Sequence, residues 1–211
     1  MCITVRHLGV TDFETTCLAM QRFTLNRNEN TQDEIWLTQH PAVYSLGLNR
    51  KNVRLPNAAN HIPVVLTDRG GKITYHGLGQ VIIYLLLDLK RHHLNIRTLV
   101  SLLENAVLEL LAKYQIDAFA KSDAPGVYVK DAAGHTAKIA SLGLRIKNNC
   151  CYHGLSLNVD MDLSPFLAID PCGYQGLKVS QTKDLGIKSS SEAIGKALLT
   201  LLVEKLGNLE A

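Results

Sequence analysis

The sequence predicts an α/β fold of the α+β type, in which a mixed, largely antiparallel sheet is flanked by helices. Helix and strand patterns follow in the order helix, several strands, helix, several strands, helix, which disfavours a doubly wound parallel sheet. Of the 211 residues, 46% are hydrophobic and 19% are charged, which is enough apolar material for a substantial core. We find no repeat and no Pro-, Gly- or Ser-rich linker, so residues 1–211 are predicted to form a single domain.

Three helices are predicted from capping signals and apolar spacing. The first covers residues 11–28 and opens with a Thr-x-x-Glu pattern, which has the form of a capping box. The second covers residues 98–114 and carries an apolar stripe that excludes Glu104. The third follows a Ser-x-x-Glu pattern at residues 189–192.

Short apolar runs between turn residues predict the strands. They cover residues 35–37, 43–46, 64–66 and 81–87 before the second helix, and residues 127–129, 138–146 and 152–159 after it. The run 81–87 is continuously apolar, so we expect this strand to be buried on both faces. It is far shorter than the roughly 20 residues of a membrane span, and no secretory signal opens the sequence. A cytoplasmic protein without a membrane span is therefore expected.

Charge and cysteine content exclude several classes of function. The net charge of +3 is slight and dispersed, so no nucleic-acid partner is expected. The five cysteines form an odd number without regular spacing, which predicts reduced thiols rather than a disulfide framework and gives no support to a metal site. Cys17, Cys150 and Cys151 are expected to be small buried hydrophobic residues.

A glycine-rich segment lies between two predicted strands. Residues 69–80 read RGGKITYHGLGQ and contain four glycines, two basic residues and a histidine. Glycines let backbone N–H groups approach a ligand closely, and Arg69 or Lys72 can meet a phosphate or a carbonyl. The segment matches neither a P-loop nor a dinucleotide-binding fingerprint. On these residues alone, a binding loop and an irregular hairpin with tight turns are equally supported.

Two strands carry polar residues that alternation places among apolar ones. Lys138 falls on the apolar face of the strand 138–146, where desolvation would disfavour its ammonium form and suit it to act as a base or as the partner of a thiolate. His153 falls on the apolar face of the strand 152–159. The alternatives are a lysine at a strand end whose ammonium reaches water, and a structural histidine.

A lone cysteine, Cys172, lies between a proline and a glycine in the stretch IDPCGYQG at residues 169–176. The proline fixes the approach of the chain, and the glycine leaves space around the sulfur. A thiol on a rigid loop, with room for an acyl group and backbone N–H donors, is what nucleophilic acyl transfer requires. An incidental cysteine in a turn is the alternative.

Taken together, these segments resemble the octanoyltransferases of lipoate biosynthesis over nearly the whole chain. The motifs are HPAVYSLG at 40–47, DRGGKITYHGLGQ at 68–80, GVYV at 126–129, KIASLG at 138–143, HGLSLN at 153–158 and PCG at 171–173. Leu78 departs from the family pattern, which generally has proline there, and we expect altered loop stiffness rather than lost activity. The family is similar in fold to the biotin and lipoate protein ligases, a mixed sheet with helices packed against it.

The resemblance implies an acyltransferase that forms an amide on a protein lysine without a cofactor. An octanoyl group would move from octanoyl-acyl carrier protein, through a cysteine thioester, to a lysine on lipoyl domains of 2-oxo-acid dehydrogenases and on the glycine-cleavage H protein. Cys172 matches the acyl-accepting cysteine and Lys138 the lysine paired with it, while His76 and His153 are possible orienting groups. The positions that match the lining of the acyl site are Arg69, Gly70, Gly71, Lys72, Ile73, Thr74, Tyr75, His76, Ser141, Leu142, Gly143, Gly154, Leu155 and Ser156.

Two other functions stay open from the residues. An ATP-dependent lipoyl or biotinyl ligase would share the fold and the lysine, but it would form an adenylate and would not need Cys172. A non-catalytic module would bind acyl carrier protein without becoming acylated. Within the acyl site, Gly71 and Gly143 are expected to leave room for the chain, so that larger residues there would favour shorter acyl groups.

Overall fold

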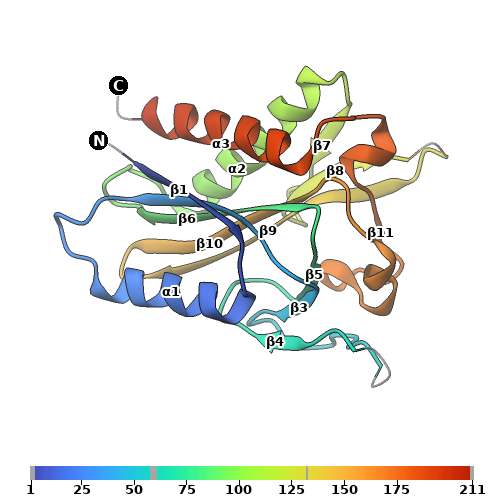
Figure 1. Cartoon of the computed structure of the whole chain (residues 1–211), viewed down its shortest axis with the longest axis horizontal. Helices are drawn as coiled ribbons and strands as arrows, with labels where there is room; N and C mark the ends of the chain where they lie inside the picture. The colour runs from blue at the N-terminus through green and yellow to red at the C-terminus, as the bar shows by residue number, and fades with distance from the viewer. Residues whose placement is uncertain (1–2, 58–60, 132, 210–211) are drawn as a thin grey trace.

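The structure is a computed structural model that describes residues 3–57, 61–131 and 133–209, with the exception of the Cys172 side chain. The described residues form two sheets, three α-helices and three short 3₁₀ helices (Figure 1). The elements are β1 (Thr4–Val10), α1 (Phe13–Asn26), β2 (Glu34–Gln39), β3 (Val43–Leu46), β4 (Val64–Leu66), β5 (Ile73–His76), β6 (Gln80–Asp88), α2 (Ile96–Lys113), β7 (Ala118–Ala120), β8 (Gly126–Lys130), β9 (Thr136–Lys147), β10 (Cys150–Asn158), η1 (Ser164–Ala168), η2 (Pro171–Gly173), β11 (Lys178–Val179), η3 (Thr182–Leu185) and α3 (Ser191–Gly207).

The larger sheet has the strand order β1-β2-β6-β10-β9-β8-β7, and β11 pairs with β9. The β1–β2 and β9–β11 pairs are parallel and the other pairs in this sheet are antiparallel, as the mixed, largely antiparallel prediction requires. In β6, Ile83 and Leu85 pack with α2 and α3, whereas Ile82 and Tyr84 pack with α1. The helices therefore cover both faces (Figure 1), and the predicted burial of this strand on both sides is confirmed.

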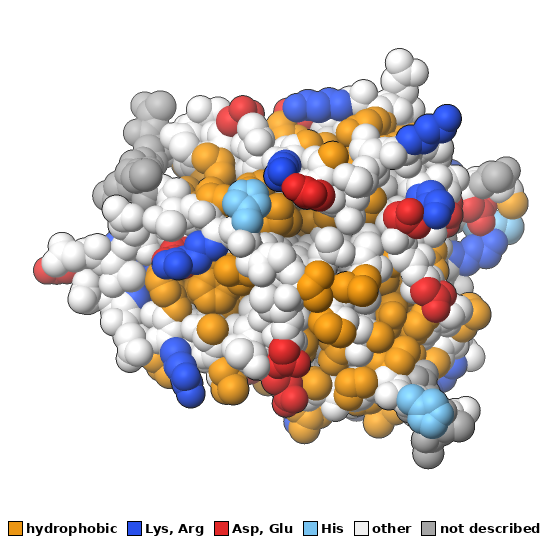
Figure 2. All heavy atoms as spheres, viewed as in Figure 1, with side chains coloured by type: hydrophobic (Ala, Val, Ile, Leu, Met, Phe, Trp, Pro, Cys, Tyr) orange, Lys and Arg blue, Asp and Glu red, His pale blue; other side chains and the backbone are white. Residues whose placement is uncertain are grey.

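The smaller sheet has the order β4-β3-β5 and packs its apolar side chains against η1. Its edge strand β4 is little covered: Val64 and Leu66 are exposed, as is Leu167 in η1. Figure 2 shows hydrophobic side chains gathered on this side of the molecule. None of the described helices is long and apolar enough to cross a membrane.

Helix ends differ from the predicted capping patterns by one or two residues. Asp12, not Thr11, caps α1, and its carboxylate accepts the Thr15 N–H at 2.8 Å. Ser190 caps α3, one residue after Ser189, with which the predicted capping pattern begins. The second helix begins at Ile96, ahead of the predicted start at residue 98, because Asn95 forms a capping box there.

Four strands were not predicted: β1, β5, β7 and β11. β7 and β11 span only three and two residues, and β1 is a largely exposed edge strand with no apolar run. β5 lies inside the glycine-rich segment, where the glycines on both sides predict turns and no strand was expected between them. The glycine-rich segment is therefore not a hairpin: β5 pairs antiparallel with β3 over four residues, whereas the following strand β6 belongs to the larger sheet.

Candidate functional site

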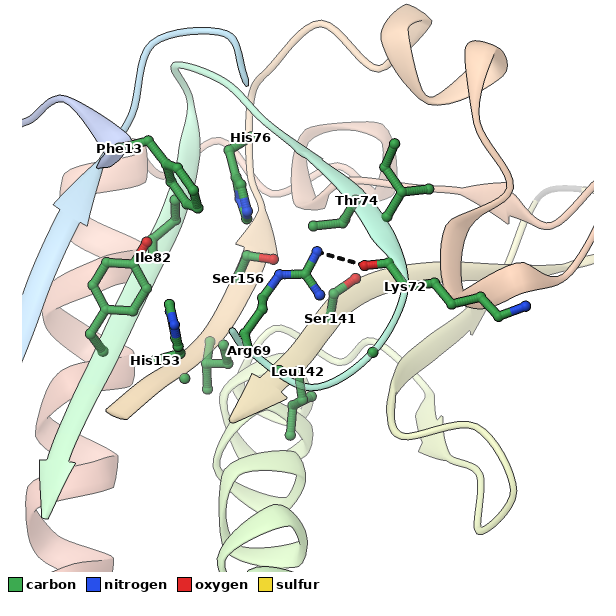
Figure 3. A pocket seen from close by; sticks show the side chains of 16 residues that line it. Phe13, Arg69, Lys72, Thr74, His76, Ile82, Ser141, Leu142, His153 and Ser156 are labelled. Carbon is green, nitrogen blue, oxygen red and sulfur yellow. Dashed lines mark hydrogen bonds between the residues drawn. The ribbon is translucent and has the colours of Figure 1, made fainter. Parts of the chain in front are cut away.

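A pocket lies between the smaller sheet and the larger one, close to the first residue of α1 (Figure 3). The turn before β5, β5 itself and the facing stretches of β9 and β10 form its walls. Ser141 and Ser156 lie directly opposite each other on β9 and β10 and both line it. The predicted residues that line the pocket are Arg69, Gly71, Lys72, Ile73, Thr74, His76, Ser141, Leu142, Gly143, His153, Gly154, Leu155 and Ser156.

Two predicted lining residues lie elsewhere. Gly70 lines a groove that adjoins the pocket, and Tyr75 points into the core of the smaller sheet. Sequence reasoning missed three lining residues, Phe13, Ile82 and Tyr84. Alternation along β6 would have placed Ile82 and Tyr84 on one face, but nothing in the sequence indicates which face borders a pocket.

Arg69 holds the loop that forms one wall of the pocket. It is 8% exposed, and its Nη2 donates to the carbonyl oxygens of Ser45 at 2.6 Å and Lys72 at 2.8 Å, the latter bond being drawn in Figure 3. Its Nη1 donates to the Gly70 carbonyl at 2.9 Å. These bonds tie the glycine-rich turn to β3, so the guanidinium fixes the shape of the loop in addition to placing positive charge beside the pocket.

His76 is held as a neutral imidazole by its hydrogen bonds. The Gln80 amide nitrogen donates to Tyr75 O and to Asn158 Oδ1, which leaves Gln80 Oε1 to accept from His76 Nδ1 at 2.8 Å. His76 Nε2 then accepts from the Ser45 hydroxyl at 3.0 Å. Burial, reinforced by the neighbouring His40, lowers the pKa of His76 to about 3. Its ring stacks on Phe13, so it can shape the pocket but has no free nitrogen for proton transfer.

His153 does not follow the predicted strand alternation. Its φ of +62° is unusual for a residue other than glycine, and its side chain points to Asp68. The hydroxyl of the adjacent Tyr152 donates a hydrogen bond to the same carboxylate, and His153 Nε2 bonds its other oxygen. The predicted shared face with Leu155 is therefore wrong, because Leu155 packs in the core against α2 and α3. Hydrogen bonds from His153 and Tyr152 hold the pKa of the Asp68 carboxyl well below its usual range, and burial lowers the pKa of His153.

Lys138 also departs from the predicted alternation. The β8–β9 register pairs Val127 with Ala140 but Tyr128 with Lys138, so β9 carries one extra residue, Ile139. Ile139 and Ala140 both pack into the core against α2 and α3, which is the behaviour of a β-bulge. Lys138 therefore lies on the face opposite the apolar residues that follow it in β9, and the prediction of a shared face is wrong.

Lys138 is nevertheless almost fully buried, with 2% of the residue exposed. Its Nζ donates to the Pro125 carbonyl oxygen at 2.8 Å and lies 5.2 Å from the centroid of the Tyr128 ring. The alternative in which the ammonium reaches water is therefore not adopted. Gly126 leaves the space for it, since a Cβ there would lie 2.7 Å from Lys138 Nζ.

Cys172 belongs to η2, but its side chain lies outside the described part of the chain. The surroundings of η2 are described. Lys72, at the mouth of the pocket, reaches this segment, since a Cβ on Gly173 would lie 2.5 Å from Lys72 Nζ. After η2 the chain returns to β9, where Val179 of β11 pairs with Lys138. The backbone that carries Cys172 thus borders the pocket mouth and leads back to Lys138.

Comparison with known proteins agrees with this architecture. The family model described as the lipoyl protein ligase A/B catalytic domain matches residues 15–200. A bipartite lipoate protein ligase from Thermoplasma acidophilum superposes with a TM-score of 0.77 at 16% identity, over 98% of this chain and 84% of that chain. Biotin protein ligase from Aquifex aeolicus superposes with a TM-score of 0.56 at 13% identity, over 99% of this chain and 70% of that chain. At such identities the likeness establishes the fold, which is that of the lipoyl and biotinyl protein ligases.

Relatives of much higher identity are octanoyltransferases. Those of Dechloromonas aromatica and Nitrosomonas europaea are 52% and 51% identical over 202 and 204 residues, covering 96% and 97% both of this chain and of each relative. That of Shewanella halifaxensis is 49% identical over 203 residues, 96% of this chain and 90% of the relative. The chain belongs to the octanoyltransferases of the lipoyl protein ligase A/B family, and it is an acyltransferase.

Proposed function

We propose that the chain moves an octanoyl group from octanoyl-acyl carrier protein, through a thioester on Cys172, to a lysine amine on lipoyl domains. The acceptors are the lipoyl domains of 2-oxo-acid dehydrogenases and the glycine-cleavage H protein. The observation that carries the proposal is a pocket with an apolar end at Phe13 and Ile82 and a basic mouth at Lys72, beside η2. Such an end suits an alkyl chain, for which each buried methylene contributes about 0.8 kcal/mol.

In the first step the Cys172 thiolate attacks the carbonyl carbon of the octanoyl thioester. A new C–S bond forms, the bond to the carrier's sulfur breaks, and the leaving thiolate takes a proton from the Lys138 ammonium. The carrier departs as a thiol, and Lys138 is left as a neutral amine. Before the reaction, the ammonium favours the Cys172 thiolate through its opposite charge.

In the second step a neutral lysine amine of the lipoyl domain attacks the acyl-enzyme. The C–N bond forms, the C–S bond to Cys172 breaks, and the neutral Lys138 amine takes the proton that the nitrogen loses. The enzyme returns to a thiolate and an ammonium, so no other reactant is needed.

Intact-mass spectrometry after mixing with octanoyl-acyl carrier protein, without ATP or Mg²⁺, tests the proposal. We expect one octanoyl adduct on the wild-type protein and on Cys17→Ser, and none on Cys172→Ser. Cys17 is a matched control beside the pocket, since burial raises the pKa of its thiol to about 12 and so suppresses the thiolate.

An adduct that persists in Cys172→Ser, or transfer by a wild-type protein that is never acylated, would contradict the covalent route. A requirement for ATP would instead favour the adenylate chemistry of a ligase, which the shared fold alone permits.

The closeness of Gly143 to Arg69 changes what a larger residue there is expected to do. A Cβ on Gly143 would lie 3.1 Å from Arg69 Cδ and from Gly70 O, so it would press on the wall of the pocket and not project into the space for the chain. We therefore expect Gly143→Val to lower kcat/KM roughly tenfold for hexanoyl and octanoyl donors alike, instead of favouring the shorter donor as the sequence predicted. A selective gain for the hexanoyl donor would show that Gly143 borders the acyl chain directly.

A further inference from the structure

Glu104 is a buried acid on α2 with no part in the chemistry above. The apolar spacing of the helix leaves it off the predicted buried stripe, yet it is only 8% exposed. Its Oε1 accepts a hydrogen bond from the Gly126 N–H at 2.8 Å. Burying a carboxyl group between a helix and a sheet is costly unless it is hydrogen-bonded, and here the bond goes to the first residue of β8.

Gly126 is the backbone against which the end of the Lys138 side chain rests. Its φ of +140° lies in a region that favours glycine, and a Cβ at this position would lie 2.7 Å from Lys138 Nζ. The carbonyl of the preceding residue, Pro125, accepts the hydrogen bond from that same Nζ at 2.8 Å. Residues 125–126 therefore supply both the space and an acceptor for the ammonium, and Glu104 holds them from the side of α2.

We propose that Glu104 is a positioning residue for acyl transfer, which acts on Lys138 through the backbone of Pro125 and Gly126. The inference rests on the proposed function, because it takes Lys138 as the group that moves the proton. Without the Glu104 acceptor the start of β8 is free to shift, and the Lys138 Nζ that rests against it is no longer held in one position. A misplacement of about 1 Å in a catalytic group is enough to cost up to roughly 10²-fold in rate.

Substitutions at position 104 that differ in reach and hydrogen bonding test this. Glu104→Gln keeps an oxygen that can accept the Gly126 N–H, so we expect kcat within roughly threefold of wild type. Glu104→Met has similar length but no such acceptor, and Glu104→Asp is one methylene too short to reach. For both we expect kcat to fall roughly tenfold or more with KM for octanoyl-acyl carrier protein unchanged. Leu111→Ala, a buried change on the same helix, should lower stability without lowering kcat.

A double-mutant cycle with Lys138→Ala decides whether the effect passes through the lysine. We expect Glu104→Met, or Glu104→Asp if the former does not fold, to cause no further loss once Lys138 is absent. An equal loss in both backgrounds, or full kcat in Glu104→Met and Glu104→Asp, would overturn the inference. Intact mass of each variant distinguishes a failure of the proposed function from a failure of this inference. The proposed function is wrong if the wild-type protein forms no octanoyl adduct. The inference about Glu104 is wrong if the adduct forms but kcat does not change as expected.

Discussion

Replacing Lys138 with alanine is expected to lower the rate of octanoyl transfer by roughly 10²-fold or more, the usual scale for the loss of a general base. The proposed cycle has Lys138 give a proton to the departing carrier thiolate and take one from the incoming amine, so its loss would slow both steps. The measurement is single-turnover kinetics of acylation and of transfer, each followed by intact mass.

Arginine at this position should not restore the rate. A guanidinium does not give up its proton near neutral pH, and Lys138 Nζ is packed closely against Gly126, since a Cβ there would lie 2.7 Å from it. Lys138→Met fills the same space without a titratable group and serves as the control for packing. It should fold like wild type and be as slow as Lys138→Ala.

Small alkylamines separate proton transfer from a fixed positive charge. In Lys138→Ala they can enter the space left by the side chain, and we expect them to raise the rate of the transfer step in proportion to their concentration as free base. Near-normal turnover by Lys138→Arg would mean that a fixed charge is sufficient, and the proton-transfer role would then be wrong.

Elements that are buried on both faces were the most predictable from sequence. β6 is continuously apolar because α1 covers one side and α2 and α3 the other, and that burial is visible in composition alone. β1 has no such run, because it lies at an edge and four of its seven residues are exposed. β5 is flanked by glycines, which read as turns whether or not a strand lies between them.

The family resemblance identified most of the residues that line the pocket, but the directions of the Lys138 and His153 side chains were not predicted. Alternation fails at Lys138 because β9 bulges at Ile139, and it fails at His153 because that residue adopts a positive φ. The bulge appears only in the pairing of β9 with β8, and nothing in the sequence marks His153 for a positive φ. Next to His153, position 154 requires a glycine, because a Cβ there would clash with the backbone of Ile83 in β6.

Contacts between segments distant in sequence were beyond prediction. Phe13 lines the pocket from α1, and Glu104 supports Gly126 from α2 across the helix–sheet interface. Periodicity assigns a charged residue to the solvent side of a helix because most such residues lie there. Periodicity therefore does not predict that Glu104 is buried and accepts a hydrogen bond from the Gly126 N–H.

A second large effect is expected at a residue that does not line the pocket, the buried carboxylate of Asp33. Both Asp33 and Arg27, with which it forms an ion pair, have side chains no more than 5% exposed. Asp33 Oδ1 also accepts the backbone N–H of Asp88 at 2.9 Å, and Oδ2 accepts from His92 Nε2 at 2.7 Å. This one carboxylate joins the end of α1, the start of β2, the end of β6 and the segment that leads into α2.

Asp33→Ala is expected to lower the free energy of unfolding by roughly 3–5 kcal/mol, because it leaves the Arg27 guanidinium buried without its counter-charge. Urea denaturation followed by circular dichroism measures the change. Asp160→Ala is the matched control, since its ion pair with Lys183 has both side chains more than half exposed, and such pairs contribute little. Equal losses in the two variants would show that burial does not set the strength of the Asp33 contacts.

The same carboxylate should make stability depend on pH in acid. Burial alone would raise the pKa of Asp33, but the hydrogen bonds from His92 and Arg27 outweigh it, so the pKa lies below its usual value for an aspartate. A carboxyl group with a lowered folded-state pKa contributes stability that is fully present above its unfolded pKa and is lost as pH falls through the folded one. Wild type should therefore lose stability below about pH 4 more steeply than Asp33→Asn, which has no proton to take up there. Parallel pH dependence of the two proteins would show that the acid sensitivity arises at other carboxyl groups.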